Sequence, residues 1–154
     1  MFVLAMLVRM AVSADAETIA KNNAALAQES ETVSLQYKTV LAGVNTVIFD
    51  KNKGFYLVAE EEHNVIGQVM ITFEWSDWQN QTMWWLQSVY IDPKWRKKGV
   101  FTTLFNEIKK QASRENIKIL RLYVNTENKK AIHAYRHLGM QKKSSYIYQL
   151  SVSP

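Results

Sequence analysis

A basic segment followed by a glycine and a helix could bind an anion. Residues 92–108 read DPKWRKKGVFTTLFNEI, which is a proline turn, a basic cluster, Gly99 and an amphipathic helix. The first N–H groups of a helix have no intrahelical acceptor, and the helix dipole adds positive partial charge there. Arg96, Lys97 and Lys98 raise the local potential, and Gly99 lets a ligand approach the backbone closely. The segment therefore suits a phosphate group, although most basic clusters only cover a solvated surface.

The common nucleotide-binding loops do not explain this segment. The sequence contains neither GxxxxGK(S/T) nor GxGxxG, the patterns of the P-loop and of the dinucleotide-binding fold. The ligand class must therefore come from the rest of the chain.

The segment NKKAIHAYRHLGM carries a tyrosine and two histidines at helical spacing. Tyr135 follows Ala131 by four residues, and without further information it reads as a packed aromatic. His133 and His137 are also four residues apart, which suits zinc, but the glutamate of HExxH is replaced by Ala134. The histidines lie nearly opposite Tyr135 on a helix, so we expect surface residues and no metal.

A tryptophan-rich segment, EWSDWQNQTMWW, offers groups for binding an amine. Trp75 and Trp78 could face a cation, and Asp77 could fix it; core packing is an equally good explanation, and membrane-interface insertion or partner binding also compete. An ammonium must lose a proton before it attacks, so a carboxylate is needed. Glu74 is our candidate base, with Asp77 and Glu31 as alternatives. The explanation that Glu74 is only a solvated glutamate at a strand end is equally good.

The elements that position these groups follow from hydrophobic periodicity and turn residues. Strands come in a run first and alternate with helices only later, which indicates an α/β fold with a mixed, mostly antiparallel sheet flanked by about four helices. The expected strands are 7–10, 55–61, 65–75, 83–91, 117–124 and 144–152, and the expected helices are 14–28, 35–41, 100–115 and 128–138, with a turn at 62–64.

Bulk composition narrows the class of protein. The chain has 154 residues, 47% hydrophobic composition, no cysteine and a net charge of +5. We expect one domain over residues 1–154, without disulfides or a cysteine nucleophile. The lysines are scattered over several elements and no RNA-binding signature is present, so nucleic-acid binding is a remote alternative.

The N-terminus resembles a signal peptide only superficially. No basic region precedes its apolar run, Arg9 interrupts that run, and the run is too short to span a bilayer. We therefore expect a cytoplasmic protein with a first strand at Leu7–Met10 and a helix start marked by Ser13 and Asp15. Met6 could be the natural start, with the preceding residues an upstream extension.

Two segments carry a resemblance to a known superfamily. VYIDPKWRKKGVFTTLF resembles the acetyl-CoA-binding segment of the GCN5-related N-acetyltransferase (GNAT) superfamily, in which a strand and a proline turn lead into R/Q-x-x-G-x-G/A. The segment LRLYVNTENKKAIHAYRHLGM is similar to that superfamily's N-x-x-A-x-x-x-Y-x-x-x-G-(F/M) helix, and the likeness extends over residues 8–150. The matching residues of the helix are Asn128, Ala131, Tyr135, Gly139 and Met140. Phe101 departs from the pattern, because the family often has a small residue there; we expect it to pack beside Phe105.

The resemblance implies a cofactor and a role for each matching residue. Backbone N–H groups of Lys97, Lys98, Gly99, Val100, Phe101 and Thr102 would bind the pyrophosphate of acetyl-CoA, and Arg96 would shape the loop. Val89, Tyr90 and Ile91 would present their backbone to the pantetheine arm, as in strand addition. Asn128 would add a side-chain contact, and Tyr135 would be the general acid for the departing thiolate.

The sequence thus predicts an N-acetyltransferase in which an amine attacks acetyl-CoA directly in a ternary complex. Backbone N–H groups near 89–91 would polarise the thioester carbonyl. The alternative is a GNAT-shaped module that binds CoA or a protein without turnover. The acceptor, a small molecule or a peptide, is left open, and a homodimer would fit the family.

Overall fold

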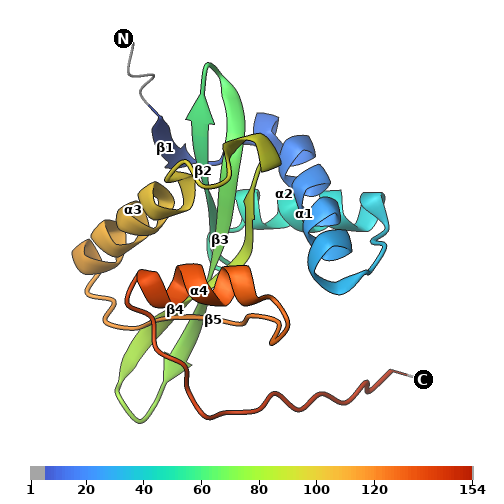
Figure 1. The fold of residues 1–154 in the computed structure, drawn as a ribbon. Helices are drawn as coiled ribbons and strands as arrows, with labels where there is room; N and C mark the ends of the chain where they lie inside the picture. Colours follow the sequence, from blue (N-terminus) through green and yellow to red (C-terminus); the bar gives the residue numbers. More distant parts are fainter. Residues whose placement is uncertain (1–5, 154) are drawn as a thin grey trace.

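The computed structural model describes residues 6–153, in which five strands form one mixed sheet (Figure 1). The strand order is β1-β2-β3-β4-β5; neighbouring strands are antiparallel except β4 and β5, which are parallel. The strands are β1 (Leu7–Met10), β2 (Phe55–Glu61), β3 (Asn64–Ser76), β4 (Gln81–Ile91) and β5 (Leu120–Leu122), and the helices are α1 (Ala16–Glu31), α2 (Tyr37–Phe49), α3 (Val100–Arg114) and α4 (Lys129–His137). The predicted α/β class with a mixed, mostly antiparallel sheet and four helices is confirmed.

Helix α3 covers one face of the sheet. Its buried residues Val100, Leu104 and Ile108 contact a cluster that includes Leu57 and Trp84 of the sheet. Burying one such side chain contributes roughly 1.5–3 kcal/mol, so this face fixes the position of α3.

The close approach of α3 to the sheet requires a glycine in β3. A β-carbon at Gly67 would lie 2.8 Å from Cγ1 of Val100, which is closer than carbon atoms can pack. Gly67 therefore allows the N-terminal turn of α3 to sit directly over β3.

Helices α1 and α2 cover the opposite face (Figure 1). Ile19 and Ala20 of α1 and Val44 of α2 are buried against Tyr56 and Val58 of β2. The two faces are thus covered by different helices, and β2 has its side chains alternately in the two cores, with Leu57 in one and Tyr56 and Val58 in the other.

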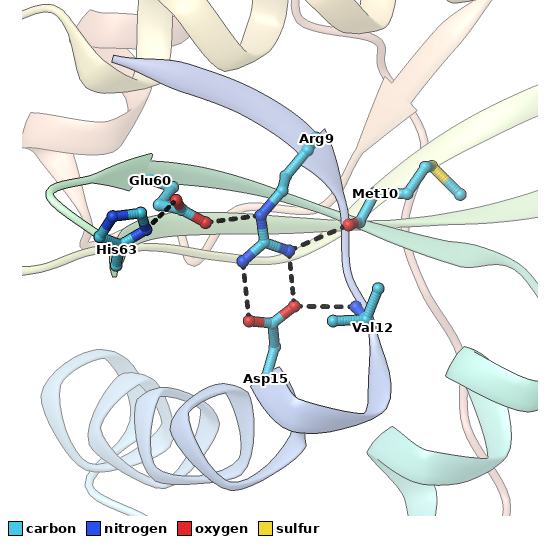
Figure 2. Close-up of polar contacts among 6 residues, drawn as sticks. All are labelled: Arg9, Met10, Val12, Asp15, Glu60 and His63. Carbon is cyan, nitrogen blue, oxygen red and sulfur yellow. Dashed lines mark hydrogen bonds and ion pairs between the residues drawn. The ribbon is translucent and has the colours of Figure 1, made fainter. Parts of the chain in front are cut away.

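An ion-pair cluster fastens β1 to α1 and β2 (Figure 2). Arg9 donates from Nη1 and Nη2 to Asp15 at 2.7 and 3.0 Å and from Nε to Glu60 at 2.6 Å. Asp15 also accepts from the N–H of Val12 at 2.8 Å. Burial alone would raise the pKa of Asp15, but the hydrogen bonds from Arg9 and Val12 outweigh it, and its pKa is lowered. Arg9, which interrupts the apolar run in the sequence, is therefore a structural residue.

The two-residue turn between β2 and β3 agrees with the predicted hairpin. Glu62 and His63 have φ values of 47° and 64°, the left-handed pair that a tight hairpin turn requires.

No helix within residues 6–153 is long and apolar enough to cross a membrane. Residues 1–5, which precede Met6 and were considered an upstream extension, lie outside the described part of the chain.

Two elements, α2 and β5, differ in length from the prediction by more than two residues. Helix α2 continues to Phe49, beyond the predicted end at 41. The side chains of Asn45 and Thr46 bond to the carbonyls of Leu41 and Ala42 at 3.1 and 2.9 Å, so these polar residues are satisfied inside the helix. Strand β5 is only Leu120–Leu122, because it pairs with β4 over three residues.

The prediction of a closing strand at 144–152 is wrong. Within residues 6–153 the sheet ends at β5, and the C-terminal segment runs past α4 as an extended chain (Figure 1). Tyr146, Tyr148 and Val152 are 88%, 92% and 89% exposed. The alternating pattern that predicted a strand has no sheet face to cover here, because the segment does not pair with the short edge of β5.

Candidate active site

Strands β4 and β5 pair over only part of β4. Trp84, Trp85 and Leu86 pair with β5, whereas β4 continues for five more residues to Ile91. The section that contains Val89, Tyr90 and Ile91 therefore lies beyond the last pair with β5. Backbone groups of an unpaired strand edge can bind an extended ligand, which is the geometry expected for a pantetheine arm.

A β-bulge interrupts β4 at the start of this section. Gln68 pairs with Tyr90 and Met70 pairs with Gln87, so Ser88 and Val89 both lie opposite Val69. Ser88 has a φ of 50°, a left-handed conformation that is costly for serine. A bulge of this kind redirects the strand, here just where the pairing with β5 has ended.

The loop between β4 and α3 begins with a cap and ends at Gly99. The carboxylate of Asp92 accepts from the N–H of Lys94 at 2.8 Å. Lys97 and Gly99 have φ values of 61° and 81°, and a β-carbon on Gly99 would meet no atom of residues 6–153 within 4 Å. The loop thus leaves open space beside its glycine, as the sequence predicts for an anion site.

The first backbone N–H groups of α3 follow Gly99 directly in the chain. The first hydrogen bond of this helix runs from the N–H of Thr103 to the carbonyl of Gly99 at 3.0 Å. The N–H groups of Val100, Phe101 and Thr102 therefore have no acceptor within the helix. These are three of the residues predicted to bind pyrophosphate.

Arg96 is held by the protein on three sides. Its Nη2 donates to Glu29 of α1 at 2.8 Å and its Nε donates to the carbonyl of Ile91 at 3.0 Å. Its guanidinium lies 5.4 Å from the ring centre of Tyr90, whose hydroxyl donates to the same Glu29 at 3.3 Å. This placement fits the predicted role of Arg96 in shaping the loop.

The neighbouring lysines lie at the exposed side of the loop. Lys97 and Lys98 are exposed, and Nζ of Lys98 lies 5.0 Å from the ring centre of Trp95. They can therefore add positive potential without being buried.

Phe101 packs as predicted, and it also connects two predicted site elements. Its ring lies 5.9 Å from Phe105 and 5.6 Å, edge to face, from Tyr135. Tyr135 of α4 therefore stands next to the first turn of α3, although 34 positions separate the two residues.

Burial raises the pKa of Tyr135 above its ordinary value of 10.0. Its hydroxyl is therefore protonated at neutral pH, as a general acid must be. The structure brings Tyr135 next to the first turn of α3; its catalytic role stays a prediction.

Asn128 caps α4. Its Oδ1 accepts from the N–H of Ala131 at 3.1 Å, a typical N-cap bond. The same residue positions the helix that carries Tyr135, and a direct contact with the cofactor stays a prediction.

Glu74, the candidate base, already accepts two hydrogen bonds. Its Oε2 accepts from Nε1 of Trp85 at 2.6 Å and from Nη1 of Arg121 at 3.3 Å. The ring of Trp85 stacks 4.3 Å from Tyr123. Glu74 therefore belongs to a polar and aromatic cluster of β3, β4 and the end of β5. If Glu74 is the general base, it acts from within this cluster.

The structure does not bring Glu74 together with the tryptophans predicted to line an acceptor pocket. Trp75 follows Glu74 directly, so its side chain points to the opposite face of β3. Trp75 is 61% exposed, and Trp78, in the hairpin loop with Asp77, is 95% exposed. Their role in acceptor binding stays a prediction, and such exposed rings have no core-packing role.

Sequence reasoning missed the residues that hold the site from α1. Glu29 lies 67 positions from Arg96, and neither residue alone indicates the pair. Gln68 had a detectable signal, because it is a glutamine inside the apolar run VIGQVMITF; it is fully buried. Arg121 and Tyr123 lay in the predicted strand 117–124 but had no predicted role.

No group of three His, Asp or Glu side chains within residues 6–153 is arranged as metal ligands would be. His133 and His137 lie on α4.

The comparisons with known proteins agree on one family. The model of the acetyltransferase (GNAT) family matches residues 18–140. The chain is 29% identical over 122 residues to the thialysine N-epsilon-acetyltransferase of Mus musculus, covering 73% of this chain and 71% of that enzyme. It is 27% identical over 97 residues to an uncharacterised N-acetyltransferase of Methanocaldococcus jannaschii, which covers 62% of this chain but only 43% of the archaeal protein.

Solved structures share the whole fold. A possible acetyltransferase from Clostridium difficile 630 has 40% identity and a TM-score of 0.89, covering 97% of this chain and 99% of that one. A predicted acetyltransferase from Clostridium acetobutylicum, solved with acetyl-CoA, has a TM-score of 0.78 at 18% identity and covers 95% of this chain and 96% of its own. With a family model that matches most of its length, this chain belongs to the GNAT family of acetyltransferases.

Proposed function

We propose that the protein transfers the acetyl group of acetyl-CoA to an amine in a ternary complex. The observation that carries the proposal is the continuity of two binding surfaces. The section of β4 beyond its last pair with β5 ends at Ile91. Helix α3, whose first N–H groups have no acceptor within the helix, begins at Val100. A ligand with an extended amide arm and a pyrophosphate matches both surfaces in one molecule.

The binding of acetyl-CoA would use mostly backbone groups. Val89, Tyr90 and Ile91 would pair with the pantetheine amides. The backbone N–H groups of residues 97–102 would bind the pyrophosphate. The side chains of Lys97 and Lys98 would add positive charge beside it. Arg96 would keep the loop in place through Glu29 rather than bind the phosphate itself.

In the reaction, the neutral amine nitrogen attacks the thioester carbon and forms the new C–N bond. The carbonyl oxygen becomes an oxyanion, which the N–H groups near Val89 stabilise. The C–S bond then breaks, and Tyr135 donates its proton to the sulfur. The proton lost by the amine goes through water to Glu74, whose Oε2 accepts from Trp85 and Arg121 and whose Oε1 can take the proton.

The acceptor is a small-molecule or peptide amine. The mouse relative is a thialysine N-epsilon-acetyltransferase. In this chain Trp75, Asp77 and Trp78 would favour an uncharged or cationic amine with an apolar portion. The proposal includes a cytoplasmic location and no nucleic-acid or membrane partner, and it allows a homodimer.

A CoA-dependent assay against a panel of amines tests the function. Free thiol release should depend on both acetyl-CoA and one class of amine, with a mass increase of one acetyl group on the amine. A module that only binds CoA would show a thermal shift with acetyl-CoA and release no thiol with any amine, and this result would overturn the proposal.

A further inference from the structure

The bulge in β4 is held by a buried glutamine of the neighbouring strand. The side chain of Gln68 is fully buried, and its Nε2 donates to the backbone carbonyl of Ser88 at 3.2 Å. Ser88 is the left-handed residue of the bulge. A buried amide with a hydrogen bond to such a residue stabilises a conformation that would otherwise be costly.

Helix α1 fixes the orientation of this amide. The same Nε2 donates to Oδ1 of Asn23 at 2.8 Å, and Oε1 of Gln68 accepts from Nδ2 of Asn22 at 3.0 Å. Asn23 in turn donates to the hydroxyl of Tyr56 at 3.3 Å. Both protons of the Gln68 amide are therefore used, and the amide cannot turn over without breaking all three bonds.

Peptide geometry transmits this restraint to the next residue. The carbonyl of Ser88 and the N–H of Val89 belong to one planar trans peptide, so they point in opposite directions. The carbonyl of Ser88 points toward the side-chain amide of Gln68, so the N–H of Val89 points away from that amide. This peptide lies in the section of β4 that has already separated from β5.

We propose that Gln68 is a positioning residue, which aims the N–H of Val89 at the thioester carbonyl of bound acetyl-CoA. This inference rests on the proposed function, because it gives the oxyanion-stabilising N–H a specific support. It also connects α1 to the reacting carbonyl through Asn22 and Asn23. Loss of one oxyanion donor typically costs on the order of 10²–10³ in kcat, and a donor that is misdirected rather than lost should cost less.

The test uses Gln68→Met, which keeps an unbranched side chain of similar length without the amide. Relative to wild type, kcat should fall at least about tenfold while the KM values for acetyl-CoA and amine change little. Val44→Ala, a buried change in α2, is the control for lost stability. A kcat within about twofold of wild type, or an equal loss in Val44→Ala at the same melting temperature, would overturn the inference.

A second readout needs no turnover. The amide signal of Val89 in a ¹H–¹⁵N spectrum should differ between the acetyl-CoA and CoA complexes of the wild type, since only the former has the carbonyl acceptor. Gln68→Met should lose most of this difference, and an unchanged difference would contradict the inference. If Gln68→Met does not fold, Asn23→Ala replaces it and should show a smaller loss of the same kind. If the wild type shows no transferase activity, the proposed function is refuted. The spectra still test the role of Gln68, because they require only the binding of acetyl-CoA and CoA.

Discussion

Tyr135 is the residue at which a catalytic and a structural role are hardest to separate. Its ring packs on Phe101 and therefore helps to hold α4 against α3. Its hydroxyl has a raised pKa because of burial, which keeps the proton available. Ring and hydroxyl thus serve different purposes, and a substitution that removes only the hydroxyl can distinguish them.

Tyr135→Phe should leave the melting temperature and acetyl-CoA affinity almost unchanged while kcat falls about tenfold or more, because general acid catalysis contributes typically 10²–10⁴-fold. Steady-state kinetics with the chemical step rate-limiting measure this. Since the pKa of Tyr135 lies above 10.0, its deprotonation should not lower the wild-type rate below pH 10. A kcat within twofold of wild type would leave only the packing role.

At the scale of elements, β1 and α1 depend on the ion-pair cluster of Arg9. Strand β1 has four residues and, among the strands of residues 6–153, β2 as its single neighbour, so its ladder alone holds it weakly. Arg9 adds contacts to Asp15 at the start of α1 and to Glu60 of β2. Because α1 also carries Asn22, Asn23 and Glu29, the cluster supports the site from a distance.

Asp15→Asn should destabilise the fold by about 1.5–3 kcal/mol at pH 7, the range for a hydrogen bond to a charged group. The pKa of Asp15 is lowered in the folded state. Its carboxylate therefore stabilises the fold above the ordinary value of 3.8, and this contribution is lost as the pH falls through the folded pKa.

Urea unfolding of both proteins from pH 7 down to pH 3 measures this dependence, and the difference between them should shrink below pH 3.8. Glu17→Gln, an exposed carboxylate change in α1, is the control and should cost less than 1 kcal/mol. A difference between wild type and Asp15→Asn that does not vary with pH would contradict the ion-pair explanation.

Across the whole molecule, local sequence patterns indicated the segments of the candidate site, but they did not indicate the contacts that support those segments. The loop around Gly99 and the α4 helix were recognisable because each is one contiguous segment. The contacts of Arg96 with Glu29 and of Gln68 with Ser88 join distant segments, and a single sequence does not pair them. The strand expected at 144–152 failed for the same reason, since an alternating pattern indicates a strand only where a partner edge is available.

The central claim is that acetyl-CoA binds with its pyrophosphate at the loop around Gly99. Gly99→Asp and Gly99→Asn form a matched pair: the two side chains have nearly the same shape and tolerate the left-handed φ of 81°, but only Asp is negative. A β-carbon there meets no atom of the described residues within 4 Å, and the strain of the positive φ is common to both variants.

Titration calorimetry with acetyl-CoA on the two variants tests this claim most directly. The negative charge beside the pyrophosphate should weaken binding by Gly99→Asp at least about tenfold relative to Gly99→Asn, which is about 1.4 kcal/mol. The melting temperatures of the two variants without ligand should agree. Equal affinities for acetyl-CoA in two folded variants would contradict the account and place the pyrophosphate elsewhere.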